Sequence, residues 1–405
     1  MSQYKEEKEA ILEKFTDIFP EDHKYFTFLK KVFRHEFRKN GFRRISTDIL
    51  ENGNFRTCSE IGIMKAYINN KLVDEIQPVY YYYIDHFLNN GVQEERIGAE
   101  ILGENDPILD AISVFVVYSV LNKIGLENNF KIKINTSGNE KEKAKYIEEL
   151  QNFYENKRHI LTKESIKLLD IDPIKLLTTK NEDEIILAKQ APNILKYLKK
   201  DTKTHYIKFK QYLDLLNVPY IEDHTISTGK DYTTHSMWEF ISDKGNLIGK
   251  GSRYESLAKT LDNPKDISAV GFYTDAFAII DMLKQKNIKI RNKDKIDLFF
   301  VQLGDEAKTV ILPLSLRARE AGINTVVSLG TPSMKEQMLK ANRSGAKYVV
   351  MVGIMEARNG VFQVRNTENG TQEEVKKEEL IDYIIQKIGT ETLDFYCPIK
   401  DLITE

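Results

Sequence analysis

The chain has 405 residues, of which 41% are hydrophobic and 30% charged, with a formal net charge of −2. This length accommodates two or three domains, and the near-neutral charge excludes an overall basic field for nucleic-acid binding while leaving a local patch open. Cys58 and Cys397 stand far apart without a C-x-x-C or His/Cys cluster, so we expect no metal site. The charged N-terminus is unlike a signal peptide, and no stretch nears the roughly 18 apolar residues of a membrane span, which favours a cytoplasmic protein without membrane contact.

The first third of the chain reads as helices alternating with strands. Apolar residues at helical spacing over 24–42 predict a helix that ends at Gly41. Residues 77–103 predict two strands joined by a loop at Asn89-Asn90-Gly91, and the strongly apolar segment 106–126 predicts a helix with a buried face. The remaining expectations are strands at 43–52 and 130–138, and a strand followed by a helix at 55–70.

A helical insertion is expected from about residue 138 to 216, where the sequence is highly charged, rich in helix formers and without a strand pattern. Strands resume near VPYIEDHTI and over HSMWEFISDKGNLIGKGSRYESL. A short charged linker at 286–295 then marks a boundary. We therefore expect a first domain at 1–290, a second at 291–390 and a tail at 391–405.

The second domain has clear α/β alternation. IDLFFVQL, INTVVSL and AKYVVMVG predict strands. The helix between the first two has acids in its first turn, arginines in its last and Gly322 after it. Ser333 and Glu336 fit a capping box for the next helix. With a hairpin at GVFQVRN and TQEEVKK and a final helix, the expected order is β-α-β-α-β-β-β-α.

Several segments, taken in order, carry a resemblance to a known family. GFRRISTDILE, PVYYYYIDHF…QEERIGAEILG and AVGFYTDAFAI look like the three class II synthetase motifs, and TGKDYTTHSMWEF and GSRYESL look like two further family segments. The last hundred residues look like an anticodon-binding domain. The chain thus resembles histidyl-tRNA synthetases over nearly its whole length. The resemblance implies an α+β fold, with a class II antiparallel sheet, flanking helices and a helical insertion, followed by an anticodon-binding-type α/β domain.

The resemblance also implies arginines that bind ATP phosphates, because that family activates histidine with ATP before transfer to tRNA. The matching positions hold Tyr81, Thr228 and Ala278. Loss of one such donor costs about 3–4 kcal/mol of transition-state stabilisation. We therefore expect a catalytically inactive site, a pseudoenzyme, with no catalytic residue and no cofactor.

Other family positions have changed too. Arg96 replaces the glutamine that reads the bound histidine, Cys58 the glutamate that holds its amino group, and Thr233 the second tyrosine of D-Y-Y; Asp275 and Phe277 also depart from the third motif. The residues that remain pocket-like are Arg56, Glu100, Asp231, Tyr232, Arg253 and Tyr254. They form either a residual small-molecule site or a set that satisfies itself, for example through an Arg253–carboxylate pair, and we favour the second.

Two further patterns have a functional and a plain interpretation. The run YYYY at 80–83 alternates faces on a strand, so two rings face the core and two the cleft. Those in the cleft either stack on a base or fill a vacated site, which we favour. In the second domain, Lys335, Lys340, Asn342 and Arg343 are RNA-binding candidates. The same holds for six lysines in the later part of the insertion, Lys196, Lys199, Lys200, Lys203, Lys208 and Lys210, although lysine-rich helix faces are commonly only solvated.

Three functions follow from the resemblance. The leading one is an inactive paralogue that binds tRNA, a tRNA-like RNA or a protein partner, and forms a homodimer through the first motif, where Asp48 replaces the usual proline. The second is a divergent active histidine–tRNA ligase using ATP and Mg, with Arg56 or Arg96 reaching ATP. The third is a histidine-sensing regulatory subunit of ATP phosphoribosyltransferase.

Overall fold

The computed structural model divides by its internal contacts into unit 1, residues 1–290, and unit 2, residues 291–405. It describes residues 18–48, 50–51, 54–89, 92–228, 230–290, 296–330, 333–390 and 393. The expected turn at 90–91, the second half of the linker at 286–295, Cys397 and nearly all of the tail at 391–405 lie outside the described residues. Within the described part of the chain, no helix has the length and apolarity needed to cross a bilayer.

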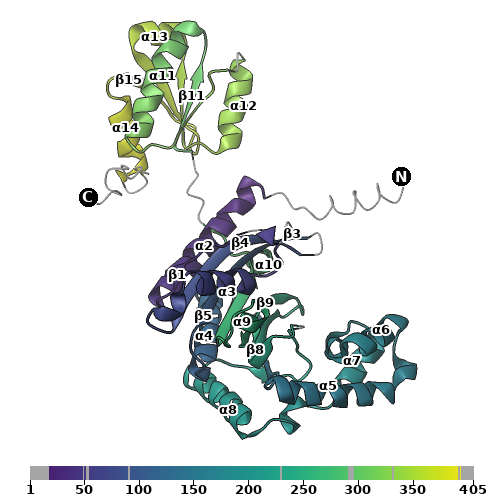
Figure 1. The fold of residues 1–405 in the computed structure, drawn as a ribbon. Coiled ribbons are helices and arrows are strands. Elements are labelled where there is room, and N and C mark those ends of the chain that lie inside the picture. Colours follow the sequence, from purple (N-terminus) through teal and green to yellow (C-terminus); the bar gives the residue numbers. More distant parts are fainter. Residues whose placement is uncertain are drawn as a thin grey trace. The chain divides into compact units, whose positions relative to one another are not determined.

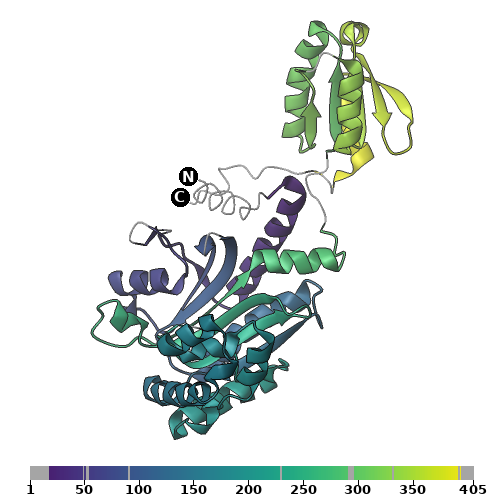
Figure 2. The same cartoon turned by 90° about the vertical axis from the view of Figure 1, so that its right-hand side faces the viewer.

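Unit 1 is built on an eight-stranded sheet with the order β1-β4-β5-β10-β9-β8-β6-β7 (Figures 1 and 2). The six central strands pair antiparallel, whereas the pairs β1–β4 and β6–β7 at the two edges are parallel. The strands are β1 Arg43–Arg44, β4 Val79–Asn89, β5 Val92–Leu102, β6 Phe130–Thr136, β7 Ile221–Glu222, β8 Thr233–Ser242, β9 Leu247–Tyr254 and β10 Ala269–Asp275, with β2 Leu50–Glu51 and β3 Asn54–Phe55 forming a separate pair.

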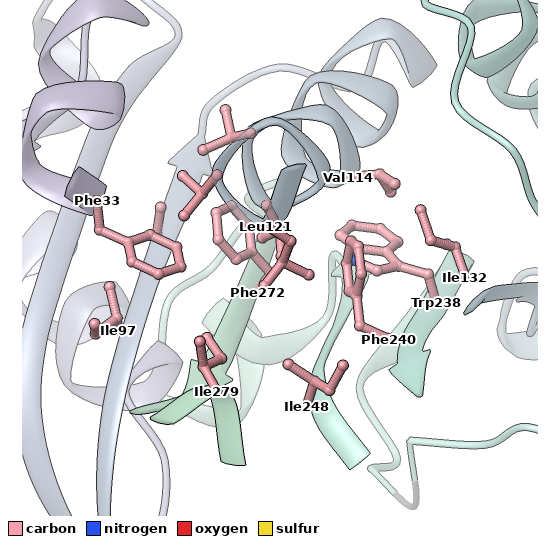
Figure 3. Close-up of a cluster of buried hydrophobic side chains, with 14 of the residues drawn as sticks. Phe33, Ile97, Val114, Leu121, Ile132, Trp238, Phe240, Ile248, Phe272 and Ile279 are labelled. Carbon is pink, nitrogen blue, oxygen red and sulfur yellow. The ribbon is translucent and has the colours of Figure 1, made fainter. Parts of the chain in front are cut away.

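One face of this sheet is covered by helices and holds the largest core. The helices on it are α2 Pro20–Lys39, α4 Pro107–Lys123, α8 Lys200–Leu215 and α10 Ala276–Gln285. The apolar segment of α4 is buried as expected, and Figure 3 shows Val114 and Leu121 against Phe272 and Trp238 of the strands. Because side chains alternate along a strand, Tyr80 and Tyr82 of β4 point into this core.

The opposite face carries a smaller cluster and the cleft described below. α3 Glu60–Asn69, η1 Leu72–Asp74 and α9 Leu257–Thr260 lie on this side. Tyr81 and Tyr83 join this second cluster with Tyr254, so the run of four tyrosines divides between the two faces as the alternation predicts. The register that sets the cleft floor places Tyr81 of β4 opposite Glu100 of β5, and Glu100 opposite Gly271 of β10.

The insertion is helical, as expected. Its elements are α5 Glu140–Glu155, η2 Arg158–Ile160, α6 Lys163–Ile171, η3 Pro173–Thr178, α7 Glu182–Lys189 and η4 Ile194–Lys196. They have a small core of their own around Leu150 and Tyr154. Figure 1 shows α5–α7 extending from the sheet, whereas α8 lies against α4 and belongs to the main core.

Unit 2 is a five-stranded sheet with the order β12-β11-β13-β14-β15, covered by helices. Its elements are β11 Leu298–Gln302, α11 Asp305–Glu320, β12 Thr325–Val327, α12 Met334–Ser344, β13 Tyr348–Val352, α13 Ile354–Asn359, β14 Val361–Asn366, β15 Gln372–Lys376 and α14 Leu380–Ile388. Ser333 caps α12 by accepting a 3.4 Å hydrogen bond from the Glu336 backbone N–H.

Two local expectations differ from the structure. The helix α13 adds an element to the expected order, because Gly353 and Gly360 bracket six residues that read from sequence as a loop. The expected strand at 43–52 is reduced to the two short pieces β1 and β2. The pairing with β4 ends with a 3.0 Å hydrogen bond from the Ile45 backbone N–H to the Tyr82 carbonyl, and no ladder partner is found for residues 46–48, so the strand does not continue there.

Candidate functional site

The three positions where the resemblance implied arginines carry no cation that points into the cleft. The buried Tyr81 ring packs in the second cluster, where Arg43 lies 5.4 Å from its centroid. The Thr228 hydroxyl is 2.7 Å from that of Thr233. Ala278 lines an open groove of about 360 Å³ between α10 and the β8–β9 turn. This groove shares no lining residue with the cavity around Glu100.

The N-terminus of α10 is occupied by the protein's own carboxylate. Asp275 accepts a 2.9 Å hydrogen bond from the backbone N–H of Phe277. Burial raises the pKa of Asp275 and the backbone bonds oppose that rise. A helix N-terminus otherwise favours an external anion, because its free N–H groups and its dipole are positive. Here the Asp275 carboxylate already occupies the position that an external anion would take at the start of α10.

The centre of the cleft holds Glu100, which is buried against the sheet. Tyr254 donates a 2.7 Å hydrogen bond to it. Burial raises the pKa of Glu100 to about 8, so the carboxyl is mainly protonated at neutral pH. The cavity beside it, with Tyr83 and Tyr232 in its wall, measures only about 30 Å³, which is room for very few water molecules.

The wall of this cavity includes an ion pair. Lys230 contacts the Glu60 carboxylate, and Tyr232 donates a 3.0 Å hydrogen bond to the same oxygen. Lys143 of α5 donates to the backbone carbonyls of Lys230 and Asp231, both at 3.0 Å, and so ties this segment to the insertion. The ammonium that enters the cleft therefore comes from the chain itself.

The arginines nearest the cleft are also neutralised locally. Arg96 donates to Glu94 at 2.6 Å and to the Thr57 carbonyl at 2.7 Å, and stacks 4.2 Å from the Tyr273 ring centroid. Arg56 pairs with Asp85 at 2.7 Å. Each guanidinium has its fork engaged, so neither presents an open pair of donors to a phosphate.

Arg253 lies on the opposite face from Tyr254, since neighbouring residues on a strand alternate. It is fully buried and contacts Asp110 of α4 at 2.6 Å. The other Asp110 oxygen is 2.7 Å from Nε2 of His205 on α8, whose ring stacks at 4.5 Å on His235. This network joins two helices to the sheet and is structural in character.

The structure thus brings together three of the six expected pocket residues, Glu100, Tyr232 and Tyr254. It separates the other three: Arg253 pairs with Asp110, Arg56 with Asp85, and the Asp231 side chain is exposed. Glu60 and Lys230 were missed, although Lys230 stands inside the quoted segment TGKDYTT. Among the described residues, no group of three or more His, Cys, Asp and Glu side chains is arranged to hold a metal ion.

The RNA-binding candidates of unit 2 all lie on α12. Lys335, Lys340, Asn342 and Arg343 are exposed, while Gln337 and Ala341 form the buried side of the helix. The helix therefore presents a basic surface that a phosphate backbone can reach.

Comparison with known proteins gives the family. Residues 297–387 match the anticodon binding domain model. A histidine–tRNA ligase of Halothermothrix orenii is 30% identical over 392 residues, covering 94% of this chain and 91% of its own. This chain belongs to the histidyl-tRNA synthetase family. A second histidine–tRNA ligase, from Acholeplasma laidlawii, is 28% identical over 333 residues, which cover 79% of this chain and 79% of that protein.

Solved structures agree with this assignment. Apo histidyl-tRNA synthetase of Staphylococcus aureus matches with a TM-score of 0.75 and 26% identity, over 92% of this chain and 98% of that one. A Bacillus halodurans protein described as an ATP phosphoribosyltransferase regulatory subunit/histidyl-tRNA synthetase matches with a TM-score of 0.59 and 16% identity, over 84% and 97%. The latter likeness concerns the fold alone. Together the matches confirm the α+β synthetase fold with its C-terminal anticodon-binding domain.

Proposed function

We propose that this histidyl-tRNA synthetase-like chain has lost aminoacylation and acts as an RNA-binding module, with tRNA or a tRNA-like RNA as its ligand. The observation that carries the first half is the start of α10, where Ala278 offers no charge and Asp275 caps the free N–H groups. A triphosphate placed there meets a carboxylate instead of a guanidinium, which converts attraction into repulsion.

The cleft supports the same conclusion. ATP with Mg does not fit the residues present, because the cavity at Glu100 is about 30 Å³ and the Lys230–Glu60 pair forms part of its wall. Arg56 and Arg96, the candidates for a displaced phosphate site, are engaged with Asp85 and Glu94. An active ligase would have to break these ion pairs before binding nucleotide.

The second half rests on the anticodon-binding domain and the exposed cations of α12. A charging assay with labelled histidine and total tRNA, run beside a gel shift with the same tRNA across salt, tests both halves. We expect a salt-dependent gel shift of the tRNA and no attachment of histidine to it. Charging overturns the first half, and the absence of any shift at micromolar protein and low salt overturns the second.

A homodimer is part of this proposal. Leu50, Val73 and Ile76, near the first-motif region, are exposed by 52%, 57% and 94%. Exposed apolar side chains of this size favour burial against a partner surface. Sedimentation equilibrium should give twice the chain mass, and a monomer at micromolar concentration would remove this element.

A histidine-sensing protein is the second candidate, because Glu100, Tyr232 and Tyr254 still lie together at the cavity. The alternative requires the Lys230–Glu60 pair to open for the ligand. Calorimetric titration with histidine separates the two candidates, since only the sensor binds it. Co-purification with an ATP phosphoribosyltransferase would then identify the regulatory-subunit form.

A further inference from the structure

The segment that contains the end of α2 is strongly basic, although the chain as a whole is not. Residues 30–44 hold seven lysines and arginines against one acid, Glu36, a net charge of +6, whereas the whole chain carries −2. Glu36 is buried and contacts Lys123 of α4 at 2.5 Å. The charge of Glu36 is therefore neutralised on the inner side of the helix and does not reduce the positive charge of the outer side.

Four of these cations form what we call the α2 stripe: Lys31, Arg34, Arg38 and Lys39. All four are exposed, and the spacings of three and four residues place Lys31, Arg34 and Arg38 on one side of the helix. The stripe extends over roughly 12 Å at 1.5 Å per residue. Among the described residues, none of the four lies within ion-pair distance of a carboxylate.

The other cations of the segment are already paired. Lys30 contacts Glu95 at 2.5 Å, Arg43 contacts Glu75 at 3.1 Å and Arg44 lies 3.7 Å from Asp85. The segment thus separates into cations that hold the fold together and four that face solvent without a counter-charge. Only the second group is available to an anionic partner.

The stripe is fixed on a rigid support. Phe26, Leu29, Phe33 and Phe37 on the other side of α2 are buried in the main core. In both views α2 lies at the periphery of unit 1 (Figures 1 and 2). Because the apolar side of α2 is buried in the core, α2 cannot insert into a bilayer as an interfacial helix does. A two-fold contact through the stripe would also oppose like charges.

We propose that the α2 stripe is an RNA-binding surface of unit 1 that holds the phosphate backbone of a base-paired RNA segment. The inference rests on the proposed function in taking RNA as the ligand, but it needs no contact from unit 2. Guanidinium forks match phosphate oxygens bidentately, and two of the four cations are arginines. Stacking of unpaired bases needs exposed aromatic rings, and the large aromatic side chains of α2 pack toward the core, so backbone contact to a duplex is the mode that the surface fits.

The test uses the full chain and a blunt RNA duplex of about 16 base pairs, which has no loop for an anticodon-type domain. The variant K31Q/R34Q/R38Q/K39Q removes the stripe. The control K163Q/K167Q/K180Q/K189Q removes the same charge from four exposed lysines of the insertion. We expect the stripe variant to bind the duplex at least about tenfold more weakly, with a salt slope about 3–4 units shallower. The control should stay within about twofold at unchanged melting temperature.

A charge-conserving variant, R34K/R38K, should keep the salt slope, which separates loss of charge from damage to the helix. The same variants and K335Q/K340Q/R343Q are then measured with total tRNA.

If the stripe variant binds the duplex as the wild type does, or the wild type does not bind it at low salt, the inference is overturned even where tRNA binds through unit 2. If duplex binding depends on the stripe but total tRNA does not bind, the inference stands and the tRNA function fails. Stripe-dependent binding to phosphatidylserine vesicles with RNA binding unaffected would also overturn it.

Discussion

The Asp275 carboxylate caps α10 through a 2.9 Å hydrogen bond from the Phe277 backbone N–H, one residue before Ala278. The resemblance implies that this part of the chain binds phosphate in the family. Two changes at the start of α10 both weaken phosphate binding. The missing guanidinium removes attraction, and the carboxylate adds repulsion and satisfies the helix dipole. Restoring an arginine at position 278 alone would leave the second obstacle in place.

Replacement of Glu100 by glutamine should change the pH dependence of stability. Burial raises the pKa of Glu100 from 4.5 to about 8, so the folded state keeps a proton that the unfolded state loses above 4.5. The contribution of this carboxyl is therefore complete below pH 4.5 and is lost progressively up to about pH 8. The glutamine of Glu100→Gln resembles the protonated carboxyl and does not lose this contribution. Above pH 8 the free energy of unfolding of the variant should therefore rise relative to that of the wild type by an amount on the order of a few kcal/mol.

Urea unfolding of the wild type and Glu100→Gln at pH 5, 7 and 9 measures the effect. The variant should gain stability relative to the wild type between pH 5 and pH 8 and show no further gain above. A difference that does not vary with pH would mean that Glu100 is ionised in the folded protein.

His235 should make the protein sensitive to mild acid. Its pKa is lowered to about 4, first by burial and then by His205 and Arg253, while Asp110 opposes the shift; Glu255 lies 3.6 Å away. The unfolded state binds a proton near pH 6.5 and the folded state does not, so stability falls as pH drops from 6.5 toward 4. The loss attributable to His235 is up to about 3 kcal/mol.

His235→Asn tests this, because asparagine tolerates the left-handed backbone at φ 52°. Thermal unfolding at pH 5 and 7.5 should show a smaller pH difference in the variant than in the wild type. An equal difference would assign the acid sensitivity to other groups.

The buried Arg253–Asp110 pair should be essential to folding. Arg253→Met leaves the Asp110 charge uncompensated in the core, which costs about 3–5 kcal/mol. Asp110→Leu combined with Arg253→Met should recover part of that loss. Arg158→Met, which breaks an exposed contact with Glu155, serves as the control and should leave the urea midpoint unchanged. A midpoint for Arg253→Met as high as that of the control would contradict the structural role.

Much of the architecture was predictable because long segments carry strong periodicity. The apolar run of α4, the β4–β5 hairpin and the helical insertion follow from sequence. So does the division of the four tyrosines, since Tyr80 and Tyr82 face one cluster and Tyr81 and Tyr83 another. Alternation also implied that Arg253 and Tyr254 point to opposite faces, yet the resemblance grouped them in one pocket.

The partners of the buried charges were not predictable. Asp110 meets Arg253 and His205 across 143 and 95 residues of sequence, and only the sheet order and the packing of α8 on α4 bring them together. The Lys230–Glu60 contact spans 170 residues. No local pattern marks such pairs, whereas the short helix α13 was missed because six residues between two glycines give too little periodicity.

Histidine-dependent exchange of pyrophosphate into ATP on the purified, folded protein measures whether the adenylation site is active. The S. aureus synthetase is the positive control, and Ala278→Arg is measured in parallel. We predict no exchange above background for the wild type, and none for Ala278→Arg while Asp275 caps the helix. Exchange by the wild type at a rate comparable with the control would show an active adenylation site and contradict the loss of chemistry argued from Thr228, Asp275 and Ala278.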